Sequence, residues 1–355
     1  MSFILENLLR ENIKKLIPYS SAREEFKGTQ GIFLDANENS LGSPIDDITE
    51  NVNRYPDPLQ VKLKKKLSSI KGIPSENLFL GNGSDEAIDI LFRAFCEPGR
   101  DNVIICPPTY GMYEVSAAIN NVGVKKINLT PETFQLNIVK IISSIDERDK
   151  LIFLCSPNNP TGNGVKWTDI ELLLENFPGI VVIDEAYINF ASYQSLTAEL
   201  PNYPNLVILQ TLSKAWGMAG LRIGMAFASE KIINVFNKIK PPYNINVVSQ
   251  QLANEALDNI EQVNAFVKII VEERKSLSIA LKEFSFISKI YSSEANFILI
   301  KVKESQKLYD YLLEKQIIVR DRSKSPLCEG CLRITIGTQK ENAELIATLK
   351  QYEKK

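Results

Sequence analysis

A chain of 355 residues with 44% hydrophobic content is long enough for about two domains, whose cores need no metal or disulfide. Its 43 acidic and 41 basic residues leave a formal charge of −2 with neither sign concentrated in one segment, which gives nucleic-acid or membrane-surface binding no electrostatic support. The absence of histidine excludes Ser-His-Asp and Cys-His hydrolases and most catalytic zinc sites, so an enzyme of this sequence must move protons through other side chains or a cofactor.

The N-terminal segment carries an acidic residue at Glu6 and lacks a basic leader and a cleavage site. No apolar run in the chain approaches the length that spans a membrane. We therefore expect a cytoplasmic protein with no membrane partner. We also expect residues 1–33 to pack beside a smaller, C-terminal domain.

Between residues 78 and 228, short runs rich in Val, Ile and Leu alternate with helical stretches. Such runs are typical of strands that are buried on both faces of a parallel sheet, with helices as crossover connections. The expected strands are 103–106, 124–127, 151–154, 180–183, 206–210 and 223–228. The expected helices include 85–95, 112–120 and 168–176. The pattern predicts a large α/β domain over residues 34–245.

After the Pro-Pro pair at 241–242 the pattern changes to a long helical region, 247–284, and then to a mixed set of elements. The elements expected in this set are strands 297–302, 317–320 and 332–336 and helices 305–315 and 340–352. We take residues 246–355 as a second, smaller α+β domain.

Polar residues follow three consecutive strands of the predicted sheet. Residues 156–162 read Ser-Pro-Asn-Asn-Pro-Thr-Gly, residues 184–187 read Asp-Glu-Ala-Tyr, and residues 211–214 read Thr-Leu-Ser-Lys. Ligands of open parallel sheets bind beyond the C-terminal ends of the strands, so these loops predict one site. Upstream, Ser84 and Asp85 open a predicted helix, whose N-terminus is suited to an anion.

These motifs resemble those of the fold-type-I aminotransferase family, in the family's order and spacing over most of the chain. The run from Ser213 to Gly224 carries the resemblance together with 159–162 and 184–187. The strings that favour the histidinol-phosphate branch of the family are 34–39, 54–58, 106–113 and 331–337. The resemblance implies a large, mostly parallel seven-stranded α/β/α domain that binds pyridoxal 5′-phosphate, and a smaller α+β domain.

The resemblance also assigns catalytic and cofactor-binding residues. Lys214 would bind the cofactor covalently and, once released by the substrate amine, carry the proton. Asp184 would pair with the ring nitrogen and keep it protonated. Tyr187 and Asn159 would hydrogen-bond the 3′ oxygen, and Tyr110 would stack on the ring.

The cofactor's phosphate is expected on a set of backbone, hydroxyl and guanidinium groups: Ser84, Asp85, Glu86, Thr211, Ser213 and Arg222. Arg222 can form two parallel bonds to a phosphate, which a lysine cannot. In the family, a tyrosine matching Tyr55 reaches the phosphate from the partner subunit, which implies a homodimer. On its own, the Tyr-Pro-Asp-Pro string at 55–58 predicts only a turn.

The substrate side of the resemblance rests on fewer residues. Arg320 and Arg333 match two anion-binding arginines that would serve glutamate through its carboxylates and histidinol phosphate through its phosphate. Arg322 lies close enough to compete with Arg320 for this role. Tyr19 and Asn37 match further substrate-side positions.

The activity implied by the resemblance is transfer of an amino group from L-glutamate to imidazole-acetol phosphate, giving L-histidinol phosphate and 2-oxoglutarate, in histidine biosynthesis. An aromatic-amino-acid aminotransferase or a threonine-phosphate decarboxylase of the same family would share Lys214 and Asp184, so these residues do not separate the three. A cofactor-binding regulator would need a DNA-binding segment and a basic patch, which the sequence lacks.

The Cys328-Glu-Gly-Cys331 string has the spacing of zinc and redox motifs. Since there is no second pair and no histidine, four zinc ligands are hard to find, and we predict no metal. The other cysteines, Cys96, Cys106 and Cys155, lie in apolar segments, which is typical of buried thiols.

Overall fold

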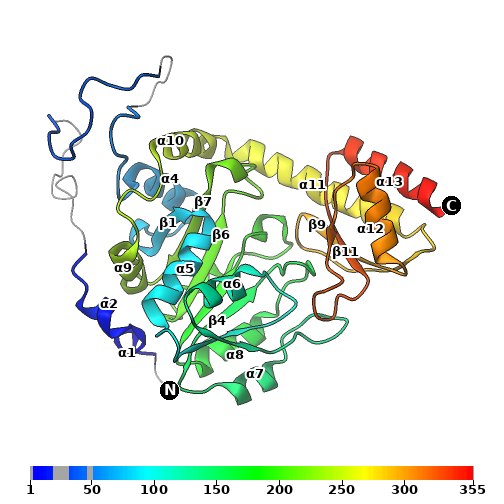
Figure 1. The fold of residues 1–355 in the computed structure, drawn as a ribbon, viewed down its shortest axis with the longest axis horizontal. Helices are drawn as coiled ribbons and strands as arrows, with labels where there is room; N and C mark the ends of the chain where they lie inside the picture. The colour runs from blue at the N-terminus through cyan, green and yellow to red at the C-terminus, as the bar shows by residue number, and fades with distance from the viewer. Residues whose placement is uncertain (1–2, 19–31, 46–50, 355) are drawn as a thin grey trace.

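The computed structural model describes residues 3–18, 32–45 and 51–354. Figure 1 shows a large sheet with helices on both faces and, towards the C-terminus, a small sheet flanked by the last helices. Within the described residues, no helix is both long and apolar enough to cross a membrane.

The large sheet has seven strands in the order β1-β7-β6-β5-β4-β2-β3. The strands are β1 (Leu78–Asn82), β2 (Asn102–Ile105), β3 (Gly123–Lys126), β4 (Asp149–Cys155), β5 (Ile180–Asp184), β6 (Leu206–Thr211) and β7 (Ile223–Ala228). Strands β6, β5, β4, β2 and β3 run parallel, whereas β7 pairs antiparallel with β1 and β6. This confirms the mostly parallel, seven-stranded sheet; β1 is the strand that the hydrophobic runs did not predict.

Alternate residues of the central strands enter two separate cores. Ile152 and Leu154 of β4 belong to one core, and Leu151 and Phe153 belong to the other. The first core includes residues of α4 (Val61–Lys71), α7 (Ile138–Ser144), α8 (Trp167–Asn176) and α10 (Val247–Ala256). The second includes residues of α5 (Gly83–Phe95), α6 (Met112–Ile119) and α9 (Glu230–Ile239). Burial on both faces, about 1.5–3 kcal/mol for each large apolar side chain, explains the continuous apolar runs.

The small sheet is antiparallel, in the order β10-β11-β9-β8. Its strands are β8 (Ile287–Ile290), β9 (Phe297–Val302), β10 (Arg320–Asp321) and β11 (Cys331–Thr335). Its core includes residues of α11 (Ile260–Leu281), α12 (Ser305–Glu314) and α13 (Gln339–Glu353). The smaller α+β unit is thus present, although β10 lies later than the expected strand 317–320. The helical region 247–284 is interrupted by a short 3-10 turn at Leu257–Asn259.

The N-terminal helices lie on the large sheet's side of the molecule. In α1 (Leu5–Leu8) and α2 (Glu11–Lys15), the side chains of Leu5 and Ile13 are buried in the same core as α5 and α9. The backbone N–H of Arg10 donates to Ala94 O (3.1 Å), and Lys238 Nζ donates to Ile13 O (2.7 Å). The expectation that the N-terminal segment packs with the small domain is therefore wrong for residues 3–18. The domain bounds 1–33, 34–245 and 246–355 stay predictions.

Residues 32–45 and 51–56 form an arm that runs outside the body of the molecule, at the upper left of Figure 1. We call these residues the N-terminal arm. Three of its large apolar side chains are almost fully open to solvent: Ile32 is 92% exposed, Leu34 83% and Leu41 98%. An arm of this kind contributes little to the core of its own chain.

Candidate active site

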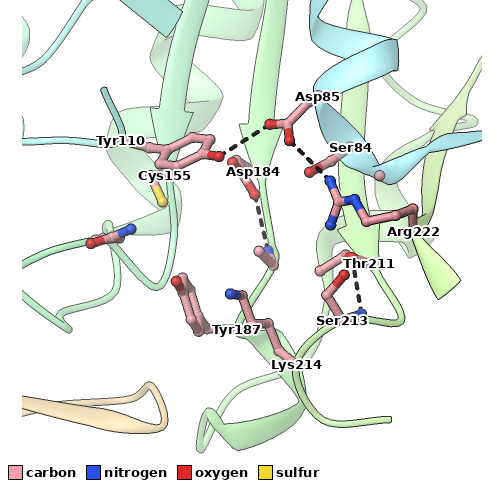
Figure 2. Close-up of a pocket in the computed structure, with 13 residues that line it drawn as sticks. Ser84, Asp85, Tyr110, Cys155, Asp184, Tyr187, Thr211, Ser213, Lys214 and Arg222 are labelled. Carbon is pink, nitrogen blue, oxygen red and sulfur yellow. Dashed lines mark hydrogen bonds and ion pairs between the residues drawn. The ribbon is translucent and has the colours of Figure 1, made fainter. Parts of the chain in front are cut away.

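A pocket lies where the C-terminal ends of β4, β5 and β6 meet the start of α5 (Figure 2). This is the edge at which open parallel sheets bind ligands. The residues that line it are Gly83, Ser84, Asp85, Tyr110, Cys155, Asn159, Asp184, Ala186, Tyr187, Thr211, Ser213, Lys214 and Arg222. The pocket brings together every cofactor-binding residue expected from the sequence except Glu86 and Tyr55.

One end of the pocket is suited to an anion. Helix α5 begins at Gly83, and Asn82 before it makes no side-chain capping bond, so the first backbone N–H groups have no side-chain cap. A Cβ on Gly224 would lie 2.1 Å from Ser84 N, so only glycine lets β7 approach the start of the helix. Gly83 itself has φ +70°, and a Cβ there would meet the Arg222 guanidinium at 2.5 Å.

Hydroxyl groups complete this end of the pocket. The hydroxyl oxygen of Ser213 is buried and has no hydrogen-bond partner among the described residues. The Ser213 backbone N–H donates to Thr211 Oγ1 (3.1 Å). Asp85 pairs with Arg222 (Nη2 to Oδ2, 3.3 Å) and accepts a bond from the Tyr110 hydroxyl (3.1 Å). An uncapped helix start, a guanidinium and an unpartnered hydroxyl fit the phosphate of pyridoxal 5′-phosphate.

A buried carboxylate lies deeper in the pocket. Asp184, the last residue of β5, is 3% exposed. Its Oδ2 accepts a bond from the Tyr113 hydroxyl (2.7 Å) and its Oδ1 from the Ala186 N–H (3.1 Å). Burial raises the pKa of Asp184, and these two hydrogen bonds oppose the rise. Such a carboxylate is suited to holding a protonated ring nitrogen.

The amine of Lys214 stands opposite, on the loop after β6. Figure 2 shows it beside the ring of Tyr187, and Nζ lies 5.7 Å from the ring centroid. Although part of Lys214 is exposed, burial around its amine lowers its pKa; nearby Arg333 lowers it further, and Asp184 opposes this. A larger share of the amine is then neutral near physiological pH than for an ordinary lysine, as a nucleophile and base requires.

The small sheet brings two of the predicted arginines to one face. Arg320 of β10 pairs directly opposite Arg333 of β11, so their side chains share a face. The guanidinium of Arg333 donates to Asn159 Oδ1 at the pocket edge, and its carbon lies 5.1 Å from the Phe297 ring centroid. Arg320 is exposed, and Arg322 is half-buried with an Nε that lacks a partner among the described residues.

Other predicted residues lie elsewhere. The carboxylate of Glu86 accepts from Asn244 Nδ2 (3.1 Å) and is not part of the pocket, so its role could only be through its backbone. Tyr55 and Asn37 line a separate hollow, in which the Tyr55 ring stacks on Tyr243 with centroids 4.4 Å apart. The prediction for Tyr19 falls outside the described residues.

Some residues of the site were not predicted. Cys155 is the last residue of β4 and directly precedes the polar run that starts at Ser156. Tyr113 lies on α6, three residues after Tyr110, which precedes the helix, and no sequence pattern places it against Asp184. Cys328 and Cys331 are buried free thiols. Across residues 3–18, 32–45 and 51–354, no three His, Cys, Asp or Glu side chains cluster as metal ligands.

Comparison with known proteins extends the match beyond the pocket. The family model for aminotransferases of class I and II matches residues 31–349. A histidinol-phosphate aminotransferase of Cytophaga hutchinsonii is 53% identical over 352 residues, which cover 99% of this chain and 100% of that protein.

Solved structures share the fold. The histidinol-phosphate aminotransferase from Clostridium acetobutylicum is 27% identical with a TM-score of 0.79, covering 86% of this chain and 92% of that one. The enzyme of the same name from Sinorhizobium meliloti, solved with pyridoxal 5′-phosphate, gives a TM-score of 0.80 at 22% identity, over 90% of this chain and 89% of that one. The similarity therefore covers most of the chain.

Proposed function

The chain belongs to the class I and II aminotransferase family, and on that premise we propose that it interconverts imidazole-acetol phosphate and L-histidinol phosphate, with L-glutamate as the amino donor and 2-oxoglutarate as the second product, in histidine biosynthesis. The observation that carries the proposal is 53% identity over nearly the whole chain to a relative of that activity. The pocket supports it, because a lysine amine, a buried carboxylate and an anion site converge there.

The cofactor is pyridoxal 5′-phosphate, which when bound supplies an aldehyde for the amino group and a ring that accepts the electron pair left on the substrate carbon. Arg222, Ser213 and the start of α5 would hold its phosphate. Asp184, when ionised, would hold a proton on its ring nitrogen, and Tyr110 would cover the ring face.

Lys214 performs the proton transfers in this proposal. As a neutral amine it takes the proton from the substrate's α-carbon, and as an ammonium it returns that proton at the cofactor side. Its lowered pKa favours the neutral form. Tyr187 and Asn159 would hydrogen-bond the cofactor's 3′ oxygen; burial raises the pKa of Tyr187, so its hydroxyl stays a donor.

Two anionic substrates must use one site in turn. Arg333 at the pocket edge and Arg320 on the same sheet face offer two guanidinium groups, which suit either a carboxylate or a phosphate. Ping-pong kinetics follow, because the first product leaves before the second substrate binds. Roles for Tyr19 and Asn37 in substrate binding stay predictions.

The active unit in this proposal is a homodimer in which Tyr55 reaches the partner's cofactor phosphate. The exposed apolar side chains of the N-terminal arm support it, since a second copy would bury them. Tyr55 also lies in a hollow separate from the pocket of its own chain. A cytoplasmic location stays a prediction.

A half-reaction tests the function. Histidinol phosphate alone is added to the purified, cofactor-loaded protein, with Lys214→Ala beside it, while the absorbance of the bound cofactor is followed. We expect a change in the wild type alone, reversed by 2-oxoglutarate. A response to phenylalanine or tyrosine instead would indicate an aromatic-amino-acid aminotransferase, and CO₂ released from threonine phosphate would indicate a decarboxylase.

A further inference from the structure

Tyr113 lies directly behind the carboxylate of the pocket. It belongs to α6, is fully buried, and stacks on Phe153 with ring centroids 4.9 Å apart and an interplanar angle of 16°. The ring of Tyr110 packs against it edge-on, with ring centroids 5.5 Å apart and an interplanar angle of 85°. With the ring held between these two, its hydroxyl lies 2.7 Å from Oδ2 of Asp184.

Within the described part of the chain, this is the one hydrogen bond that the Asp184 carboxylate receives from another side chain. The other bond, to Oδ1, comes from the backbone N–H of Ala186. Each carboxylate oxygen accepts two bonds when ionised, so one acceptor position on each oxygen remains. The titratable groups that surround Asp184 on the neighbouring elements are Asp85, Tyr110, Tyr113, Cys155, Tyr187 and Lys214.

We propose that Tyr113 is a positioning residue: its hydroxyl fixes Oδ2 of Asp184 and so directs the remaining acceptor positions of the carboxylate at the protonated ring nitrogen of the cofactor. The inference rests on the proposed function, because Asp184 has this role only if the pocket binds pyridoxal 5′-phosphate. Tyr113 itself touches neither cofactor nor substrate and is not part of the pocket lining.

A phenol suits this position for an electrostatic reason. Burial raises the pKa of Tyr113 well above its usual range, and the neighbouring Asp184 raises it further. The hydroxyl therefore stays a neutral donor at every pH at which the enzyme works. A histidine in the same place would change its charge near neutral pH, but this chain contains none. The charge at the ring nitrogen then depends on Asp184 alone.

The competing explanation is that Tyr113 only fills space between Phe153 and Tyr110. Tyr113→Phe separates the two, because it keeps the ring and removes the oxygen. Tyr203→Phe is the matched control: the Tyr203 hydroxyl also donates to a carboxylate, Glu171 (3.0 Å), on the surface and outside the pocket.

The experiment measures the dissociation constant of pyridoxal 5′-phosphate and the pH dependence of the bound cofactor's absorbance in Tyr113→Phe, Asp184→Asn, the double variant and Tyr203→Phe. We expect Tyr113→Phe to weaken cofactor binding about 10- to 100-fold, the usual effect of a lost hydrogen bond to a charged group. The change in the bound cofactor's absorbance at acidic pH should move to higher pH in this variant. The reason is that Asp184 loses the hydrogen bond that favours its ionised form. Tyr203→Phe should match the wild type.

The double variant shows whether Tyr113 acts on the cofactor through Asp184. If Tyr113 acts through Asp184, the double variant should bind the cofactor as weakly as Asp184→Asn alone and show the same pH dependence. Equal effects of Tyr113→Phe in both backgrounds, or none in the wild type, would overturn the inference. If Asp184→Asn itself leaves cofactor binding and absorbance unchanged, the assignment of Asp184 in the proposed function fails instead.

Discussion

The pocket and the N-terminal arm are built in opposite ways. The pocket is polar, lies at the edge of a sheet with two cores, and is closed by contacts between segments far apart in sequence, such as Tyr113 and Asp184. The arm mixes polar and apolar residues, lies outside the body, and exposes Leu41 almost completely. One chain therefore brings together the residues that line the pocket, whereas Ile32, Leu34 and Leu41 of the arm stay exposed to solvent in a single chain.

This difference teaches where each kind of substitution should act. Changes in the pocket should alter chemistry with little effect on assembly, because the residues there are held by their own chain. Changes in the arm should alter assembly and, through Tyr55, the neighbouring site. The predictions below separate the two, beginning with the largest expected effect.

Lys214→Ala should have the largest effect. Removing the amine eliminates the nucleophile and the proton carrier together, and turnover should fall at least about 10⁴-fold. Since Lys214 is partly exposed and packs no core, the thermal unfolding of the apoprotein should not change. Steady-state kinetics and a melting curve check this. Residual turnover within a factor of about 100 of the wild type would remove Lys214 from the mechanism.

Asp184→Asn should lower activity and raise stability at once. Loss of one partner of a buried charge pair costs about 3–5 kcal/mol, so kcat/KM should fall about 10²- to 10⁴-fold. The folded pKa of Asp184 is raised above its ordinary value of 3.8, so ionisation opposes folding as the pH rises. The apoprotein variant should therefore be more stable than the wild type at neutral pH, with no gain below pH 3.8. Urea unfolding at both pH values checks the sign.

The sequence was sufficient for the parts of the pocket that follow from sheet geometry. Asp184 ends β5 and Lys214 lies on the loop that follows the neighbouring strand β6, and the C-terminal ends of parallel strands share one edge of a sheet. It was not sufficient for contacts set by tertiary packing: Tyr113 reaches Asp184 across 71 positions, and Glu86 turns its carboxylate towards Asn244. No local pattern encodes either contact.

The N-terminal segment shows the same limit. The spacing of Leu5 and Ile13 does not say which surface buries these side chains, and both α5 and the small domain offer apolar surface. The resemblance named Tyr55, but its position depends on a second copy of the chain. Elements were thus predictable from local pattern, whereas partners between elements were not.

Mixing a weakened variant with an inactive one should show whether Tyr55 serves the neighbouring site. Tyr55→Ala should lower kcat/KM about 10- to 100-fold through the lost bond to the phosphate. In a mixed dimer with Lys214→Ala, one pocket would contain Lys214 of one chain and Tyr55 of the other. Activity should then recover when the two variants are unfolded and refolded together. No recovery above the sum of the separate variants would place Tyr55 in its own chain's site or in none.

The smallest effect is expected in the arm. Leu41→Ser should leave the unfolding free energy of a single chain within about 0.5 kcal/mol, because this side chain is 98% exposed and contacts no core. If a second copy buries it, the symmetric dimer loses about 1.5–3 kcal/mol at each of its two Leu41 side chains, and its dissociation constant rises about 10²- to 10⁴-fold. Sedimentation equilibrium measures this.

Val139→Ser is the matched control for Leu41→Ser, since Val139 is also largely exposed, at 77%, but lies on α7, away from the arm. It should change neither dissociation nor kcat. Leu41→Ser should in addition lower activity only at protein concentrations near its dissociation constant, because the pocket of each chain is intact and only the partner's Tyr55 is lost. The opposite outcome is an unchanged dissociation constant and an activity that does not depend on protein concentration. It would mean that no second copy buries the arm and that the pocket is active without a residue from the partner.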